Sequence, residues 1–352
     1  MTDEQPSKEI KEESVKIDQF GFFTKKSSCD PHLSLQHSTI TSLKKEKGQI
    51  KADNRRTEKW INMLQEENWS AYLTGKKRNT LKNRCRKGIP DALRGKAWFQ
   101  LTGANALKKD KPNVYNELLG IKEAKWEEQI VLDVDRTFPN HIMFQKIGGI
   151  GQLQLLRILR AYSLYDEEVG YCQGISYIAG FLLTYMIEEN VFWMLVALMR
   201  NERYHLYDTY ISGMPKALKT MSTMDVLINK KLKKAISNHF KKLSIQTPMY
   251  MTGWIMTLFT SDFPFEYVVR IFDAFTSEGY KIIYRIILTL LKEAGKNVIQ
   301  FNFEDTIKYL QKTPFIVREL FVNPNQLMIQ SFSIRLKAME IQRIEENYEM
   351  KR

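Results

Sequence analysis

Residues 130–139 read Ile-Val-Leu-Asp-Val-Asp-Arg-Thr-Phe-Pro, and residues 170–174 read Gly-Tyr-Cys-Gln-Gly. In the first stretch Ile130, Asp133 and Arg136 are three residues apart, so a helix places all three on one side. Asp133 can then pair with Arg136, while Ile130 anchors the helix in the core. The final proline disfavours helical backbone for the residue before it. We therefore predict a helix that ends near Arg136, from which the guanidinium can project beyond the surface.

The second stretch places Gln173 between Tyr171 and Gly174, at the start of an apolar segment over 174–187 that predicts a buried helix. Gly170 and Gly174 allow another backbone to approach closely. An arginine that neutralises a transferring phosphoryl group and a glutamine that orients the attacking water are the side chains that complete a GTPase site. Simpler interpretations stay open here: a surface ion pair for the arginine, and local backbone hydrogen bonding for the glutamine.

The chain has no motif for holding a nucleotide, a metal or a covalent intermediate of its own. GxxxxGK(S/T), GxGxxG, GxSxG, HExxH and the deaminase pattern are all missing from the sequence. The cysteines, Cys29, Cys85 and Cys172, and the five histidines show no metal-ligand spacing, and the cysteine usage fits a reducing compartment. No secretory signal is visible, and the apolar stretch 175–187 is shorter than the about 20 residues that span a bilayer. We therefore predict no intrinsic enzyme activity, no cofactor, no metal and a cytoplasmic location.

The charge balance of the 352 residues is strongly basic, with a net charge of +13. This excess favours an acidic partner, which could be nucleic acid, an anionic membrane face or an acidic protein, although a solvated lysine-rich surface gives the same composition. The strongest local run lies over 76–87, where seven basic residues occur without an acidic one. It is compatible with peripheral contact to an anionic membrane and equally with a solvated helix face.

From Gly88 onward the hydrophobic pattern is almost entirely helical, and period-2 runs are scarce. We predict an all-α fold with helices over 91–102, 113–119, 123–134, 151–164, 174–187, 190–201, 215–239, 249–259, 264–275, 279–294, 303–311 and 326–346, and with prolines, including Pro314, near the breaks. We divide the chain into a disordered tail over 1–55, a basic helical lead-in over 56–87, a main domain over 88–315 and a C-terminal helical extension over 316–352. Thr57 is placed as the cap of a helix that runs to about Tyr72.

Residues 88–104 add a third motif, in which Arg94 and Trp98 form an R-x-x-x-W pattern. Together with I-x-x-D-x-x-R at Ile130, Asp133 and Arg136, and Y-x-Q at Tyr171 and Gln173, this ordered set resembles the TBC domain of Rab GTPase-activating proteins. Further similarity lies at 214–216, 264–273 and 278–281, so the resemblance covers about 88–315. It implies a multi-helix domain of two helical subdomains.

The resemblance also implies how such a protein acts. Arg136 and Gln173 would enter the nucleotide site of a GTP-bound Rab-type GTPase in trans, and GTP and Mg²⁺ would belong to that partner. Vesicle trafficking on endomembranes would be the process regulated, and no nucleic acid is expected as a partner. A set of neighbours would support the site without reacting: Arg94, Trp98, Ile130, Asp133, Tyr171 and Gly174.

Two departures from the family pattern concern packing or the partner-facing surface. Phe272 stands where the family often has tryptophan, and residues 232–235 lack a proline that the family often has there. Two rival functions stay open, a catalytically silent TBC scaffold that binds a Rab or a membrane, and a basic nucleic-acid-binding helical protein. The apolar island Phe20-Gly21-Phe22-Phe23 is either a docking segment or an isolated patch, and the stretch 325–352 either binds a partner or packs on its own domain.

Overall fold

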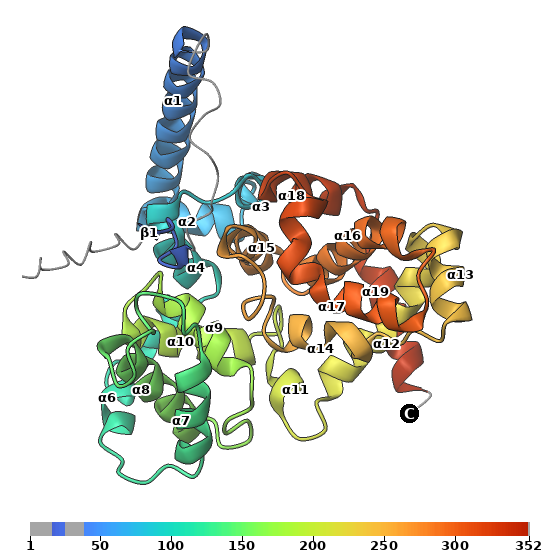
Figure 1. Ribbon diagram of the computed structural model, residues 1–352. Coiled ribbons are helices and arrows are strands. Elements are labelled where there is room, and N and C mark those ends of the chain that lie inside the picture. The colour runs from blue at the N-terminus through green and yellow to red at the C-terminus, as the bar shows by residue number, and fades with distance from the viewer. Residues whose placement is uncertain (1–15, 25–38, 351–352) are drawn as a thin grey trace, which may run out of the picture.

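The computed structural model describes residues 16–24 and 39–350 of the chain, and this part is almost entirely helical. Figure 1 shows two groups of helices, one that includes α6, α7, α8 and α10 and another that includes α12 to α14 and α16 to α19, with α4, α9 and α15 between them. The all-α fold with two helical subdomains is therefore confirmed, and the two-residue strands of one hairpin are the only strands of the described residues.

The N-terminal part consists of this hairpin and three helices that precede the main domain. Their bounds are β1 (Lys16–Ile17), β2 (Phe23–Thr24), α1 (Thr39–Met63), α2 (Glu66–Leu73) and α3 (Arg78–Lys87). The stretch 1–55, expected as a disordered tail, thus has secondary structure at 16–24 and from 39, while 1–15 and 25–38 lie outside the described residues. Trp60 and Met63 bury the end of α1, and Thr57 lies inside the helix rather than at its cap.

The first group of helices carries the motifs of the sequence. Trp98 lies in a helix between the two groups, and α10 packs against α5 and α8, while α7 packs against α8. The bounds are a 3-10 turn (Asp91–Leu93), α4 (Arg94–Leu101), α5 (Ala104–Asp110), α6 (Val114–Leu119), α7 (Glu127–Arg136), α8 (Ile150–Tyr165), α9 (Ile175–Leu183) and α10 (Glu188–Arg200).

The second group surrounds α16, whose helix is buried on most sides and packs against α12, α15, α17 and α18. The bounds are α11 (Tyr207–Tyr210), α12 (Pro215–Lys231), α13 (Lys234–Lys242), α14 (Pro248–Met256), α15 (Phe265–Glu278), α16 (Lys281–Val298), α17 (Phe303–Leu320), α18 (Pro324–Ser333) and α19 (Ala338–Glu349).

Several predicted helix limits differ from the structure. The segments 215–239 and 326–346 each divide into two helices, and Pro314 lies inside α17 instead of at a break. Proline removes one backbone hydrogen bond, but burial of the same helix face, including Leu310 and Val317, holds α17 together. The domain limit expected at residue 315 therefore falls within a continuous helix.

The C-terminal stretch packs on the domain. The Tyr284 hydroxyl of α16 donates to Glu345 of α19 at 2.6 Å, and Lys231 of α12 forms an ion pair with Glu340 at 2.8 Å. Leu327 and Ile344 are buried as well. The packing alternative for 325–352 therefore agrees with the structure. In the described part of the chain, no helix has both the length and the apolar character needed to cross a bilayer.

Candidate functional site

Helix α7 ends at Arg136, as the proline three residues later predicts. Thr137 leaves the helix with extended backbone, and its hydroxyl donates to the carbonyl of Asp133 at 2.6 Å. Phe138 leaves the helical region as expected before a proline, and it takes a left-handed conformation with φ +49°. That strained backbone is held by aromatic packing, since the Phe138 ring makes edge contacts with Phe265 and Tyr177 at 5.1 and 5.4 Å.

A buried carboxylate holds the guanidinium of Arg136. Arg136 Nη2 lies 2.5 Å from Asp133 Oδ1, and the arginine side chain is 49% exposed while that of Asp133 is 3% exposed. The other carboxylate oxygen accepts a hydrogen bond of 2.5 Å from the Tyr171 hydroxyl. Burial raises the pKa of that hydroxyl, and the neighbouring carboxylate raises it further, so Tyr171 stays a neutral donor. Ile130 is fully buried.

The loop with Gln173 is tied to the same helix end. Tyr171 reaches Asp133, and the Tyr177 hydroxyl in α9 donates to the carbonyl of Arg136 at 3.3 Å. Gln173 lies between these two anchors and is exposed, and its side chain makes no hydrogen bond within the described residues. The local-backbone interpretation of this glutamine therefore has no contact to support it. One carboxylate and one tyrosine thus couple the positions of the predicted arginine and glutamine.

Two glycines shape this loop in different ways. Gly174 precedes α9 with φ +110°, and a side chain there would lie 3.0 Å from the carbonyl oxygen of Met256, so the predicted close backbone approach occurs. Gly170 has φ +54°, but the group against it is the indole of Trp126 rather than a backbone. Burial raises the pKa of the Cys172 thiol, and the nearby Asp133 raises it further, so the thiol stays protonated.

Arg94 and Trp98 form a second cluster of arginine, carboxylate and aromatic residue. Asp273 in α15 lies 3.4 Å from Arg94 Nε and accepts a hydrogen bond of 3.0 Å from the Trp98 indole. It also accepts from the backbone N–H of Ile89 at 2.9 Å. Burial raises the pKa of Asp273 to about 6, while Arg94 and Arg270 oppose that rise. The cluster joins α4 to α15, and Phe272 is fully buried beside Trp98, which makes that departure from the family a matter of packing.

A groove of about 1040 Å³ lies beside Arg136. Its walls come from the β hairpin, from the turn after α7, from residues 260–266 and from α17, with Phe315 at its edge. Phe22 of the hairpin packs on Phe265 at 4.8 Å, and the backbone N–H of Phe23 donates to Asn140 at 3.0 Å. The apolar island is therefore a docking segment that builds one wall of the groove. Gln173 does not line this groove, and the described residues contain no cluster suited to a metal ion.

The comparisons with known proteins agree with this geometry. The model of the Rab-GTPase-TBC domain family matches residues 91–299. The chain is 35% identical over 264 residues to TBC1 domain family member whacked from Drosophila melanogaster, with 75% of this chain and 70% of that protein covered. It is 33% identical over 313 residues to TBC1 domain family member 10A from Mus musculus, with 87% of this chain but 59% of the mouse protein covered. The chain belongs to the Rab-GTPase-TBC domain family.

Solved structures show the same fold. The crystal structure of the Chlamydomonas flagellar RabGAP TBC domain matches with a TM-score of 0.70 and 26% identity, covering 90% of this chain and all of that one. The Ypt/Rab-GAP domain of Gyp1p matches with a TM-score of 0.63 and 20% identity over 80% of this chain and 97% of that domain. The arrangement of helices is thus shared at low sequence identity.

Some residues of the site could not be found from the sequence. The carboxylate that pairs with Arg94 belongs to Asp273, which lies 179 residues away along the chain. Tyr177, which contacts the carbonyl of Arg136, carries no motif of its own. For the wall of the groove that the hairpin forms, the aromatic island over 20–23 was the one indication in the sequence.

Proposed function

We propose that this protein is a GTPase-activating protein for a Rab-type small GTPase, and that Arg136 and Gln173 enter the partner's nucleotide site. The observation that carries the proposal is the half-exposed guanidinium of Arg136 on a buried carboxylate, coupled through Tyr171 to the loop of Gln173. A guanidinium that is fixed by a carboxylate and still partly exposed suits a residue that acts on another molecule, because preorganised donors need little reorganisation during the reaction.

The two side chains divide the chemistry. The planar guanidinium of Arg136 neutralises charge that develops on the transferring phosphoryl group, and the amide of Gln173 orients the attacking water. GTP and Mg²⁺ are bound by the partner in its GTP-bound state. An arginine supplied in trans is worth about 10³ to 10⁵ in rate, or about 4–7 kcal/mol of the activation barrier. The relative from Caenorhabditis elegans named Rab GTPase-activating protein tbc-11 is 38% identical over 226 residues, which supports the proposed partner class.

The test is the rate of GTP hydrolysis by a panel of purified Rab proteins with wild-type protein, Arg136→Ala and Gln173→Ala. We expect at least one Rab to respond to the wild type, and Arg136→Ala to lose nearly all of that stimulation while it remains folded. Gln173→Ala should lose about 10²-fold, the usual loss for one oriented polar group. Full stimulation by Arg136→Ala would exclude the mechanism.

A catalytically silent scaffold is the second candidate, motivated by the ion pair that holds Arg136 on Asp133 in the free protein. Wild-type protein that binds GTP-loaded Rab proteins without accelerating hydrolysis by any of them would establish it. We place either activity in the cytoplasm, at the surface of the endomembranes where Rab proteins regulate vesicle transport.

A further inference from the structure

The basic residues of the N-terminal helices do not form one continuous face. Lys82 and Arg86 of α3 point to the domain, where both pair with Glu278 at 3.1 and 2.5 Å. Arg84 and Lys87, on the other side of α3, face α1. Within the basic run over 76–87, Lys82 and Arg86 are therefore structural, whereas Arg84 and Lys87 face the space between α1 and α3.

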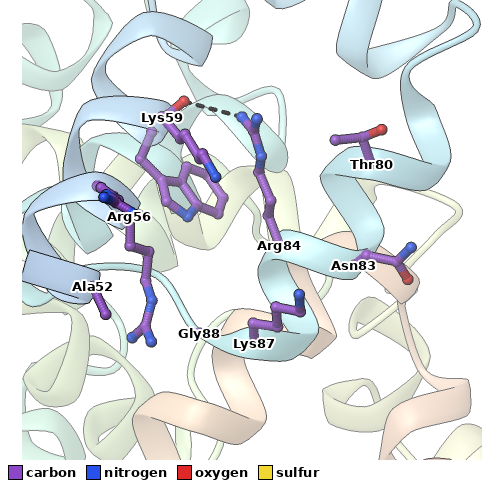
Figure 2. Close-up of a pocket in the computed structure, with 10 residues that line it drawn as sticks. Ala52, Arg56, Lys59, Thr80, Asn83, Arg84, Lys87 and Gly88 are labelled. Carbon is purple, nitrogen blue, oxygen red and sulfur yellow. Dashed lines mark hydrogen bonds between the residues drawn. The ribbon is translucent and has the colours of Figure 1, made fainter. Parts of the chain in front are cut away.

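A cavity of about 570 Å³ lies between α1 and α3, and Figure 2 shows side chains from both helices around it. Five basic residues line this cavity, which we call the α1–α3 pocket: Arg55, Arg56, Lys59, Arg84 and Lys87. No acidic residue of the described chain lines it. Its volume is within the range of about 300–1,000 Å³ that is usual for small-molecule sites.

These cations have few carboxylate partners. Arg56 lies 3.6 Å from Asp53, whereas Arg84 donates to the carbonyl of Lys59 at 3.0 Å, a contact drawn in Figure 2, and also contacts Met63 and the Tyr72 ring. Arg55, Lys59 and Lys87 form no ion pair with any described residue. Complementing a helix dipole accounts for Lys87 at the end of α3, but Arg55 and Lys59 lie within α1, where the dipole gives no stabilisation. Arg55 and Lys59 are also like charges four residues apart in α1, which repel each other.

Neutral donors complete the pocket. Trp60 is 1% exposed and borders the pocket, and its indole N–H has no acceptor in the part of the chain that the structure describes. Thr80 and Asn83 of α3 add a hydroxyl and an amide to the lining. Several cations with neutral donors and no carboxylate suit an anion that carries more than one phosphate, because each oxygen accepts charge-assisted hydrogen bonds.

We propose that the α1–α3 pocket binds a small anion that carries several phosphate groups, and the two sources that the test separates are a phosphoinositide lipid headgroup and a free inositol polyphosphate. The pocket is distinct from the groove beside Arg136, because the two share no lining residue. Occupation by a lipid headgroup would place the protein on a membrane through α1 and α3, independently of its action on a GTPase.

The test compares three full-length proteins. The pocket variant carries Arg55→Gln, Lys59→Gln and Lys87→Gln. The matched control carries Lys233→Gln, Lys234→Gln and Lys242→Gln, which removes the same charge from three exposed residues at α13, far from α1 in Figure 1. Thermal unfolding and circular dichroism establish that all three fold, and stimulation of GTP hydrolysis in the absence of vesicles should be equal for all three.

Calorimetry with inositol tetrakisphosphate measures the soluble arm. Co-sedimentation measures the membrane arm, with phosphatidylcholine vesicles that contain phosphatidylinositol bisphosphate or enough phosphatidylserine for equal charge. We expect the pocket variant to bind inositol tetrakisphosphate at least about tenfold more weakly than the control, since one charge-assisted hydrogen bond is worth about that factor. Preference for the phosphoinositide vesicles, lost only in the pocket variant, identifies a lipid source, whereas binding in the soluble arm alone identifies a free anion.

Three results would overturn the proposal. Absence of binding by the wild type in both arms is the first. Equal weakening in the pocket variant and in the control is the second, because net charge would then explain the binding. The third is stronger competition by duplex DNA at matched phosphate concentration, which would indicate a nucleic-acid surface instead.

Discussion

Arg136 and Arg94 have similar surroundings and opposite exposure. Each pairs with a buried carboxylate, Asp133 or Asp273, and in each case an aromatic donor, Tyr171 or Trp98, binds the same carboxylate. The side chain of Arg136 is 49% exposed, whereas that of Arg94 is 9% exposed. The motif chemistry is therefore the same, and solvent access separates a residue that can act on a partner from one that joins two helices.

The first and largest predicted effect concerns the exposed arginine. Arg136→Lys keeps the charge but loses the planar fork, so we expect stimulation of a responsive Rab to fall about 10³-fold, which is about 4 kcal/mol. Single-turnover GTP hydrolysis gives the rate, and the melting temperature should not change. If lysine sustained wild-type stimulation, positive charge alone would suffice, and the comparison with Arg94 would lose its basis.

The buried arginine should show the opposite behaviour. Arg94→Ala leaves the carboxylate of Asp273 buried with fewer donors, so we expect the free energy of unfolding to fall by about 3 kcal/mol. Urea denaturation measures the loss. Stimulation per folded molecule, measured well below the melting temperature, should stay near the wild-type level. A large loss of stimulation in protein that is fully folded would instead assign Arg94 a direct role.

A smaller effect tests the coupling between the two predicted fingers. Tyr171→Phe removes the hydroxyl that holds Asp133, with a cost in stability of about 1–2 kcal/mol. Asp133 then holds the guanidinium of Arg136 less firmly in place. We expect about a tenfold fall in the maximal rate of stimulation, with little change in affinity for the GTP-loaded Rab. A change confined to affinity would indicate that Tyr171 shapes the docking surface and does not position Arg136.

The smallest effect concerns the hairpin wall of the groove. His141 Nε2 lies 2.7 Å from the carbonyl oxygen of Phe20, and the backbone N–H of Met143 donates to His141 Nδ1 at 3.1 Å. Burial lowers the pKa of His141, although Phe20 and Asp18 oppose this, so the folded protein favours the neutral ring. The stability from this residue is therefore present above about pH 6.5 and is lost as the pH falls through the lowered pKa.

Melting temperatures of wild type and His141→Gln between about pH 7 and pH 5 measure this contribution. We expect the wild type to lose more stability than the variant on acidification, because glutamine does not titrate. Parallel pH dependence in the two proteins would show that other groups account for the loss.

Much of the site could be predicted because its residues are close in sequence. The end of α7 follows from Pro139, and the pairing of Asp133 with Arg136 follows from helical spacing. Contacts between distant segments could not be predicted in this way. Nothing local indicates that Asp273 binds Arg94 and Trp98, or that the 20–23 island packs on Phe265. The left-handed backbone of Phe138 also depends on packing, which overrides the local preference of a residue before proline.

The sequence by itself determined the helical class, the three motifs and the types of side chain that a GTPase site needs, because periodicity and spacing are properties of neighbouring residues. Tertiary structure alone decided which of two similar arginines meets solvent and which basic residues of α3 face α1 instead of Glu278. Both outcomes depend on burial, and burial is set by segments that are far apart in the chain and meet only when it folds.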